Sequence, residues 1–166
     1  MASGSHSQTS FDVSRYAGQW FEIYRSKNIP FEKGTDITAT YTINENDGSV
    51  AVVNKEWLPQ KKQWNQATGT ASVDDPSVPA QLTVRFFRFL PGGNYQVMKT
   101  DYDNFSVVLS DNSWFFGFYR RKYAWILARQ PALPEPTVTE CFNILQSVGL
   151  EKNDFVKTSH GEAPKL

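Results

Sequence analysis

Three polar residues in the sequence stand where large apolar side chains would be expected. Glu22, Asn54 and Glu56 each share the parity of apolar residues in segments whose residues alternate. In a β-strand, residues of one parity face the same side of the sheet. A polar group that faces an apolar interior costs about 1–3 kcal/mol unless it has a partner. The pattern therefore predicts polar contacts for a water molecule, a neighbouring side chain or a bound ligand.

Groups for catalysis or metal binding are sparse. Cys141, the single cysteine, lies beside the apolar stripe of a segment with helical periodicity, and we expect it to be a small packed hydrophobe. His6 and His160 lie in the two tails, so no histidine-based acid–base pair or metal site is predicted. The sequence has no glycine-rich phosphate loop. We therefore expect a binding protein and not an enzyme.

A further set of residues is spread along the chain in three pieces. The pieces are Gly18 with Trp20, then Thr100, Asp101 and Tyr102, and finally Arg129. Separately, they are typical of a turn glycine before a core tryptophan, a turn-initiating aspartate and an arginine that reaches solvent. Together they indicate that the first and last strands are neighbours, since Arg129 can then stack on the Trp20 ring. Such a cation–π pair contributes about 1 kcal/mol.

Short strands are the elements that must position these residues. Eight segments are rich in β-branched or aromatic residues and end in turn residues: FEIYR, TATYTI, SVAVVNKEW, NQATGTASV, QLTVRFFRF, YQVMKTDY, FSVVLS and KYAWILAR. Eight antiparallel strands can form a sandwich or a closed barrel, and a barrel of this size holds one small ligand. Periodicity does not choose between the two, but the predicted contact between Trp20 and Arg129 favours the closed barrel.

The flanking segments have different patterns. After a proline-rich stretch, an amphipathic helix is predicted on the outside of the strands, with one apolar stripe: Val138, Cys141, Phe142, Leu145 and Val148. The tail after Gly149 is polar, and we expect it to be extended or loosely docked. Residues 1–10 are predicted to be a disordered leader or a remnant of an expression tag, and residues 11–166 to be a single domain.

Composition limits the class of partner. Seventeen basic and seventeen acidic residues leave no net charge, which argues against nucleic acid as the main partner, because phosphate neutralisation needs a basic excess. No run of apolar residues is long enough to span a membrane as a helix. Aromatic residues make up 14% of the chain, and such side chains suit pleated surfaces and apolar pockets.

These segments resemble the lipocalin family. The order Gly-x-Trp, Thr-Asp-Tyr and terminal Arg is similar to its three signature regions. FDVSRYAGQWFEIYR, FEKG, ATYT, TDYDN, YAWILARQPALP and APKL resemble its apolipoprotein D-like and bacterial outer-membrane branch. The resemblance implies an all-β fold: an eight-stranded antiparallel up-and-down β-barrel, with one C-terminal α-helix packed on the outside. Its interior would be a cup (a calyx) open at one end for a hydrophobic or amphipathic ligand.

One departure from the resemblance concerns disulfides. Relatives of this branch tie loops and tail to the barrel with disulfides, whereas the matching positions here are Asp36, Asp111 and Ala163. We therefore expect packing alone to hold the loops and the tail. The resemblance implies a secreted or membrane-associated protein, but the missing cysteines and signal peptide leave an intracellular location open, and equally an altered protein.

Alternation and the resemblance together predict the lining of the cup. If Trp20 faces inward, alternation places Glu22 and Tyr24 inward too. The full predicted set is Glu22, Tyr24, Tyr41, Val52, Asn54, Glu56, Phe86, Leu90 and Trp125. The resemblance supports four of these as pocket positions: Tyr41, Asn54, Phe86 and Trp125.

The expected function is binding, with transport or sequestration, of a fatty acid, a lysolipid or a sterol-like molecule. No cofactor is expected beyond a bound lipid or tetrapyrrole. Two alternatives stay open. The first is a tetrapyrrole such as a bilin or haem, because the resemblance implies an acid at Glu22 facing pyrrole nitrogens. The second is an engineered scaffold with altered mouth loops, which would carry no apolar guest.

The hairpin of residues 111–123 has an unusual composition. It combines aromatic with basic residues: Trp114, Phe115, Phe116, Phe118, Arg120 and Arg121. An aromatic tip with a basic base is typical of an interfacial membrane anchor, which makes peripheral contact with a membrane or lipoprotein a possible second role. The alternative is that alternation turns half of these residues into the cup.

Overall fold

The alternating segments form nine strands, eight of them long. The structure, a computed structural model, describes residues 6–27, 29–30, 32–86, 93–114 and 119–165, and only the backbone of 112–114 and 119–121. Its elements are α1 (Val13–Tyr16), β1 (Gly18–Ser26), β2 (Thr35–Ile43), β3 (Val50–Leu58), β4 (Gln63–Val73), β5 (Gln81–Arg85), β6 (Gly93–Thr100), β7 (Phe105–Trp114), β8 (Tyr119–Ala128), α2 (Glu135–Gln146), a 3₁₀ turn (Lys152–Asp154) and β9 (Phe155–Lys157).

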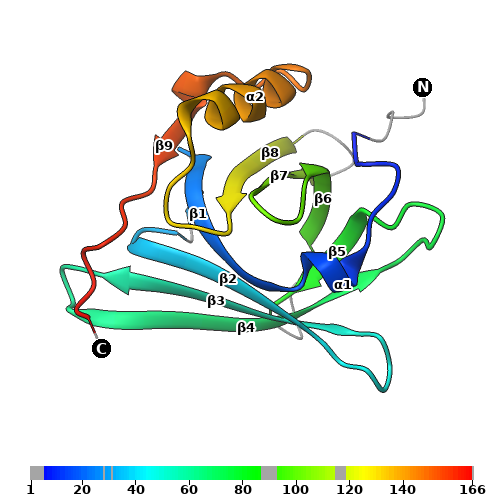
Figure 1. Ribbon diagram of the computed structural model, residues 1–166, viewed down its shortest axis with the longest axis horizontal. Helices are drawn as coiled ribbons and strands as arrows, with labels where there is room; N and C mark the ends of the chain where they lie inside the picture. Colours follow the sequence, from blue (N-terminus) through cyan, green and yellow to red (C-terminus); the bar gives the residue numbers. More distant parts are fainter. Residues whose placement is uncertain (1–5, 28, 31, 87–92, 115–118, 166) are drawn as a thin grey trace.

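The eight long strands close into a barrel. Each strand pairs antiparallel with the next, β8 pairs with β1, and β1 also pairs with β2 from Gly18 opposite Tyr41 to Phe21 opposite Thr38. Closure gives each described strand of β1 to β8 a neighbour on both sides, and β9 pairs with the part of β1 that β2 leaves unpaired, whereas a sandwich of the same strands would have free edges. The predicted fold class is therefore confirmed, with the short β9 as an addition (Figure 1).

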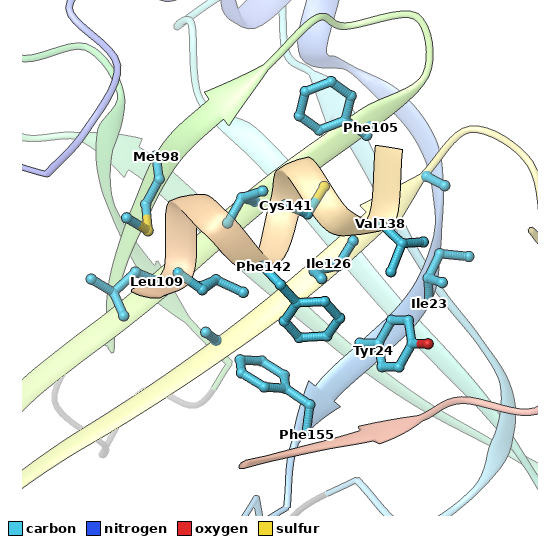
Figure 2. Close-up of a cluster of buried hydrophobic side chains, with 14 of the residues drawn as sticks. Ile23, Tyr24, Met98, Phe105, Leu109, Ile126, Val138, Cys141, Phe142 and Phe155 are labelled. Carbon is cyan, nitrogen blue, oxygen red and sulfur yellow. The ribbon is translucent and has the colours of Figure 1, made fainter. Parts of the chain in front are cut away.

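The helix α2 covers the outside of the barrel. It starts after Pro134 and carries a proline in its first turn, where the missing N–H costs no hydrogen bond. The predicted apolar stripe is buried against the outer faces of β1, β7 and β8; Cys141 and Leu145 are fully buried. Figure 2 shows this cluster beneath the helix. Among the described residues no helix is long and apolar enough to cross a membrane.

Both flanking segments contact the barrel. Gln8, within the predicted leader, donates its backbone N–H to the carbonyl of Val97 at 2.8 Å, and its side-chain oxygen accepts the N–H of Thr100 at 2.9 Å. At the other end, β9 pairs with Tyr24–Ser26 of β1, on the stretch where β2 no longer pairs. The chain after β9 therefore lies in the gap between β1 and β2.

A single carboxylate fastens this tail. Asp36 accepts the backbone N–H groups of Gly161 at 2.6 Å, Glu162 at 3.2 Å and Ala163 at 3.0 Å. Burial raises the pKa of Asp36, but these bonds outweigh it and hold the pKa below its usual value. The expectation that packing alone holds a loosely docked tail is therefore wrong: hydrogen bonds join Asp36 to Ala163, two of the positions at which the resemblance implies disulfide cysteines.

Candidate functional site

Arg129 closes one end of the barrel. Its guanidinium carbon lies 3.8 Å from the centroid of the Trp20 ring, and its nitrogens donate to the carbonyls of Tyr102 at 2.8 Å and Gln19 at 3.0 Å. Nη2 donates further to the carbonyls of Arg15, Tyr16 and Ala17. Gly18 has a φ of +101°, and a Cβ there would lie 3.2 Å from Arg129 Nη1. The predicted meeting of the first and last strands occurs here.

The Thr100–Tyr102 turn supports the same end. The Thr100 hydroxyl donates to the carbonyl of Phe105 at 2.7 Å, and Asp101 accepts the N–H of Phe105 at 3.0 Å. Tyr102 has a φ of +67°, which turns its carbonyl toward the guanidinium of Arg129. These residues stabilise the closed end of the barrel and do not line the cup.

Four hydroxyl groups form the floor of the cup. Tyr95 OH is 2.8 Å from Tyr16 OH and 3.0 Å from Tyr41 OH, and Tyr16 OH is 2.9 Å from Ser106 Oγ. Burial raises the pKa of Tyr16 to about 12 and raises the pKa values of Tyr41 and Tyr95 as well, so these phenols stay neutral. Tyr41 thus lies inside the barrel as predicted, but its hydroxyl is already bonded to protein.

Asn54 differs from every other buried polar side chain that the structure describes. Its Oδ1 atom is buried and has no hydrogen-bond partner. Its cross-strand neighbours on β2 and β4 are Ala39 and Ala67, whose short apolar side chains offer the amide no hydrogen-bond partner. Phe86 lies further down the same wall, against Gly69, where a Cβ would come within 2.9 Å of the Phe86 ring. On the inner face of β2, β3 and β4, this unpartnered oxygen thus lies between apolar residues on one side and the bonded pair of Glu56 and Asn65 on the other.

Glu56 is satisfied by the protein. Its carboxylate accepts the backbone N–H of Lys33 at 3.1 Å and of Gly34 at 2.8 Å, and the side-chain amide of Asn65 at 3.0 Å. It is buried, as the alternation predicts, but these bonds use it to anchor the segment that leads into β2. Its contacts are therefore structural, whereas the sequence suggested a ligand contact.

A polar cluster lies near the opposite end of the cup from the tyrosine floor. Glu22 accepts from Arg25 Nη1 at 3.2 Å and from the hydroxyl of Thr158 at 2.6 Å. Glu32, from the segment between β1 and β2, accepts from the indole N–H of Trp125 at 3.3 Å and shares a hydrogen bond with Glu22. Burial first, and then the bond and charge of Glu22, raise the pKa of Glu32 well above its usual value.

Tyr24 does not line the cup. Glu22 pairs with Leu127 and Tyr24 with Ile126, so the register shifts by one residue between them. This β-bulge reverses the alternation, because paired residues share a face and Ile126 lies under α2. The Tyr24 ring accordingly packs edge-on against Phe142 of α2, with centroids 5.1 Å apart (Figure 2). The prediction for Tyr24 is wrong, and the same bulge brings Arg25 onto the face that Tyr24 was expected to occupy.

The remaining predicted residues have different outcomes. Val52 is 1% exposed and packs in the closed-end core with Trp20 and Tyr41. Leu90, Phe115, Phe116 and Phe118 lie outside the described residues, as do the side chains of Trp114, Arg120 and Arg121.

Several residues of the site were not predicted, among them Tyr16 and Ser106 of the floor. Glu32 lies outside the strands, where no periodicity marks an inward direction. Arg25 depends on the bulge, which has no glycine to signal it. Tyr95 could have been found by alternation, since it pairs with Leu82, a residue that the alternation of β5 already placed inside.

Comparison with known proteins identifies relatives across nearly the whole chain. The model of the lipocalin-like domain matches residues 11–160. Apolipoprotein D of Mus musculus is 39% identical over 159 residues, which cover 95% of this chain and 81% of that protein. Outer membrane lipoprotein Blc of Escherichia coli (strain K12) is 32% identical over 148 residues, covering 88% of this chain and 77% of that protein.

Solved structures agree on the fold. Insecticyanin from the tobacco hornworm Manduca sexta superposes with a TM-score of 0.81 at 19% sequence identity, covering 98% of this chain and 88% of that one. At this identity the likeness shows the barrel alone.

Proposed function

This chain belongs to the lipocalin family, and from that premise we propose that its cup binds a fatty acid, a lysolipid or a sterol-like molecule for transport or sequestration. The observation that carries the proposal is the buried, unpartnered Oδ1 of Asn54 on the inner wall of the barrel. A buried acceptor without a donor costs about 1–3 kcal/mol. A lysolipid or a sterol-like molecule, which has an apolar body and a hydroxyl group, would supply that donor, and a fatty acid would do so in its protonated form.

The variant Asn54→Leu tests this assignment. We expect it to raise the free energy of unfolding by about 1 kcal/mol, because it removes an unsatisfied polar group without a change in size. In contrast, its affinity for dodecanol should fall about tenfold, equal to one lost hydrogen bond of about 1.4 kcal/mol. Competition against a fluorescent probe, N-phenylnaphthylamine, measures the affinity, and urea denaturation measures the stability.

A matched ligand and a matched variant serve as controls. The methyl ether of dodecanol cannot donate a hydrogen bond, so Asn54→Leu should leave its affinity unchanged. Asn46→Leu, at an exposed position of the β2–β3 hairpin, should bind both ligands as the wild type does. Equal losses for alcohol and ether would contradict the role of Asn54, and failure of every apolar probe to bind would contradict the function.

Tetrapyrrole binding is the second candidate, and it depends on Glu22. Here the Glu22 carboxylate is already bonded to Arg25, Thr158 and Glu32, so pyrrole nitrogens would have to displace these partners. Native mass spectrometry and an absorbance scan of freshly purified protein separate the possibilities. A copurified lipid supports the carrier, a visible band supports a tetrapyrrole, and an empty cup favours a reselected scaffold.

The proposal is binding without catalysis. The Cys141 thiol packs under α2 on the outer side of the barrel, where burial raises its pKa to about 12. A thiol in that state is a poor nucleophile near neutral pH and is remote from the cup. Within the described ranges, no three His, Cys, Asp or Glu residues are grouped so that they could hold a metal ion.

Peripheral membrane contact through the hairpin of residues 111–123 is a separate proposal, supported by its composition. Reversing the charge of Arg120, Arg121 and Lys122 to glutamate should abolish flotation with anionic liposomes, because each basic residue near such a surface contributes about 1 kcal/mol. Charge reversal at the exposed Lys61 and Lys62 of the β3–β4 hairpin is the control. Flotation that survives the triple reversal would overturn this proposal.

A further inference from the structure

The segment between β1 and β2 places a side chain of its own where a ligand would bind. Glu32 reaches the indole N–H of Trp125 at 3.3 Å and the carboxyl of Glu22, and both of these residues belong to the inner face. Ile29 of the same segment is only 5% exposed. We propose that Glu32 is a proton-linked plug: the protonated carboxyl occupies the cup, and its ionisation expels it and admits the ligand.

The two residues after Glu32 are held by their backbone, whereas Glu32 is held by its side chain. The N–H groups of Lys33 and Gly34 are bonded to Glu56, and a Cβ at Gly34 would lie 2.3 Å from the carbonyl oxygen of Trp57. Glu32 itself is fastened by its side chain, through Trp125 and Glu22. Loss of those two bonds would release Glu32 without disturbing the start of β2.

The electrostatics favour a neutral Glu32 inside the cup. Two carboxyl groups in contact cannot both ionise at low cost, and Glu22 already has a cationic partner in Arg25. The charged and titratable groups around the pair come from several elements: Glu22 and Arg25 on β1, Tyr41 on β2, Glu56 on β3, Tyr123 on β8 beside the Trp125 ring, and His160 in the tail, whose Nε2 is 2.6 Å from the carbonyl oxygen of Glu22. Arg25 is the cation that acts on Glu32, and it is shared with Glu22.

The direction of the pH effect follows from linkage. With Glu32 in the cup its pKa is raised well above the usual value, whereas in water it would return to about 4.3. The closed form therefore binds more protons and is fully favoured at low pH. As the pH rises between the two pKa values, opening becomes more favourable by up to about tenfold per pH unit. A ligand that needs the open form should bind more tightly in the same range and release a proton.

The experiment measures affinity for N-phenylnaphthylamine, an apolar probe without charge over this range, from about pH 5 to about pH 8. The wild type should bind at least about tenfold more tightly at the upper end. Glu32→Gln keeps a neutral group in the cup at every pH, so its affinity should be low and change less than about twofold. Glu45→Gln, an exposed glutamate at the closed end, should behave as the wild type does.

A second variant and a direct titration complete the test. Glu22→Gln removes the neighbouring charge, so the transition should move to lower pH. Carbon-13 NMR of the Glu32 carboxyl should show its pKa raised in the free protein and lowered by the probe.

This plug rests on the proposed function, and the outcomes separate the two. A wild-type profile as flat as that of Glu32→Gln, or a Glu32 that titrates at the usual pKa, would overturn the plug and leave the carrier function intact. If neither the wild type nor Glu32→Ala binds the probe at any pH, the proposed function fails and the plug fails with it.

Discussion

Replacing Arg129 by methionine is expected to lower the free energy of unfolding by about 3 kcal/mol. The change removes the stacking on Trp20 at 3.8 Å, worth about 1 kcal/mol. It also removes the guanidinium donors from five backbone carbonyls, those of Arg15, Tyr16, Ala17, Gln19 and Tyr102. Of these, the Tyr16 carbonyl keeps the indole N–H of Trp20 as a donor at 2.8 Å. Arg129 is only partly buried, so water would replace some of these bonds, and we count about 2 kcal/mol for them.

Urea denaturation followed by tryptophan fluorescence measures this loss. Arg129→Lys keeps the charge but cannot present a planar fork of five donors, so it should recover less than half of the stability. Arg85→Met removes an exposed arginine from β5 and should change the stability by less than about 0.5 kcal/mol. If Arg129→Met were as stable as Arg85→Met, the closed end would not depend on this residue.

Joining the tail to β2 by a disulfide is expected to have the second large effect on the free energy of unfolding. The backbone N–H of Ala163 lies 3.0 Å from the carboxylate of Asp36, so cysteines at the two positions would stand within reach of each other. Closing a loop of more than 100 residues stabilises by roughly 4.7 kcal/mol in the chain-entropy model. Two costs reduce this gain. The three hydrogen bonds to Asp36 are lost, and cysteine is disfavoured at position 36, where the backbone φ is +51°.

We therefore expect the oxidised Asp36→Cys, Ala163→Cys variant to be about 2 kcal/mol more stable than the wild type. The gain should disappear with a reducing agent, and each single cysteine variant should be less stable than the wild type. The advantage should also widen in acid. The pKa of Asp36 is depressed in the folded state, so its contribution is present above the unfolded pKa and is lost as the pH falls through the folded one. No gain on oxidation at any pH would show that the tail adds nothing to the stability of the barrel.

Much of the barrel could be predicted from the sequence, because its strands and its helix are marked by patterns among residues close together in the chain. Strand alternation depends on neighbouring residues, and it correctly placed Tyr41, Val52 and Glu56 among the buried residues. The helical stripe of α2 was equally local. The pairing of Trp20 with Arg129 was inferable from the two residue types and their places at the ends of the strand series, and it in turn favoured a closed ring.

The tertiary structure decided what depends on register and on groups meeting from distant segments. A single bulge in β1 turned Tyr24 outward and Arg25 toward the cup, and one inserted residue leaves no mark in the composition. Asn54 was a candidate by parity, but its unpartnered oxygen depends on the alanines that β2 and β4 place beside it. Glu56 and Asp36 found partners among backbone N–H groups, which every sequence offers and no sequence marks. Glu32 meets the carboxyl of Glu22 and the indole of Trp125, which lies on the last strand of the barrel. Strand alternation cannot predict this contact, because Glu32 lies outside the strands.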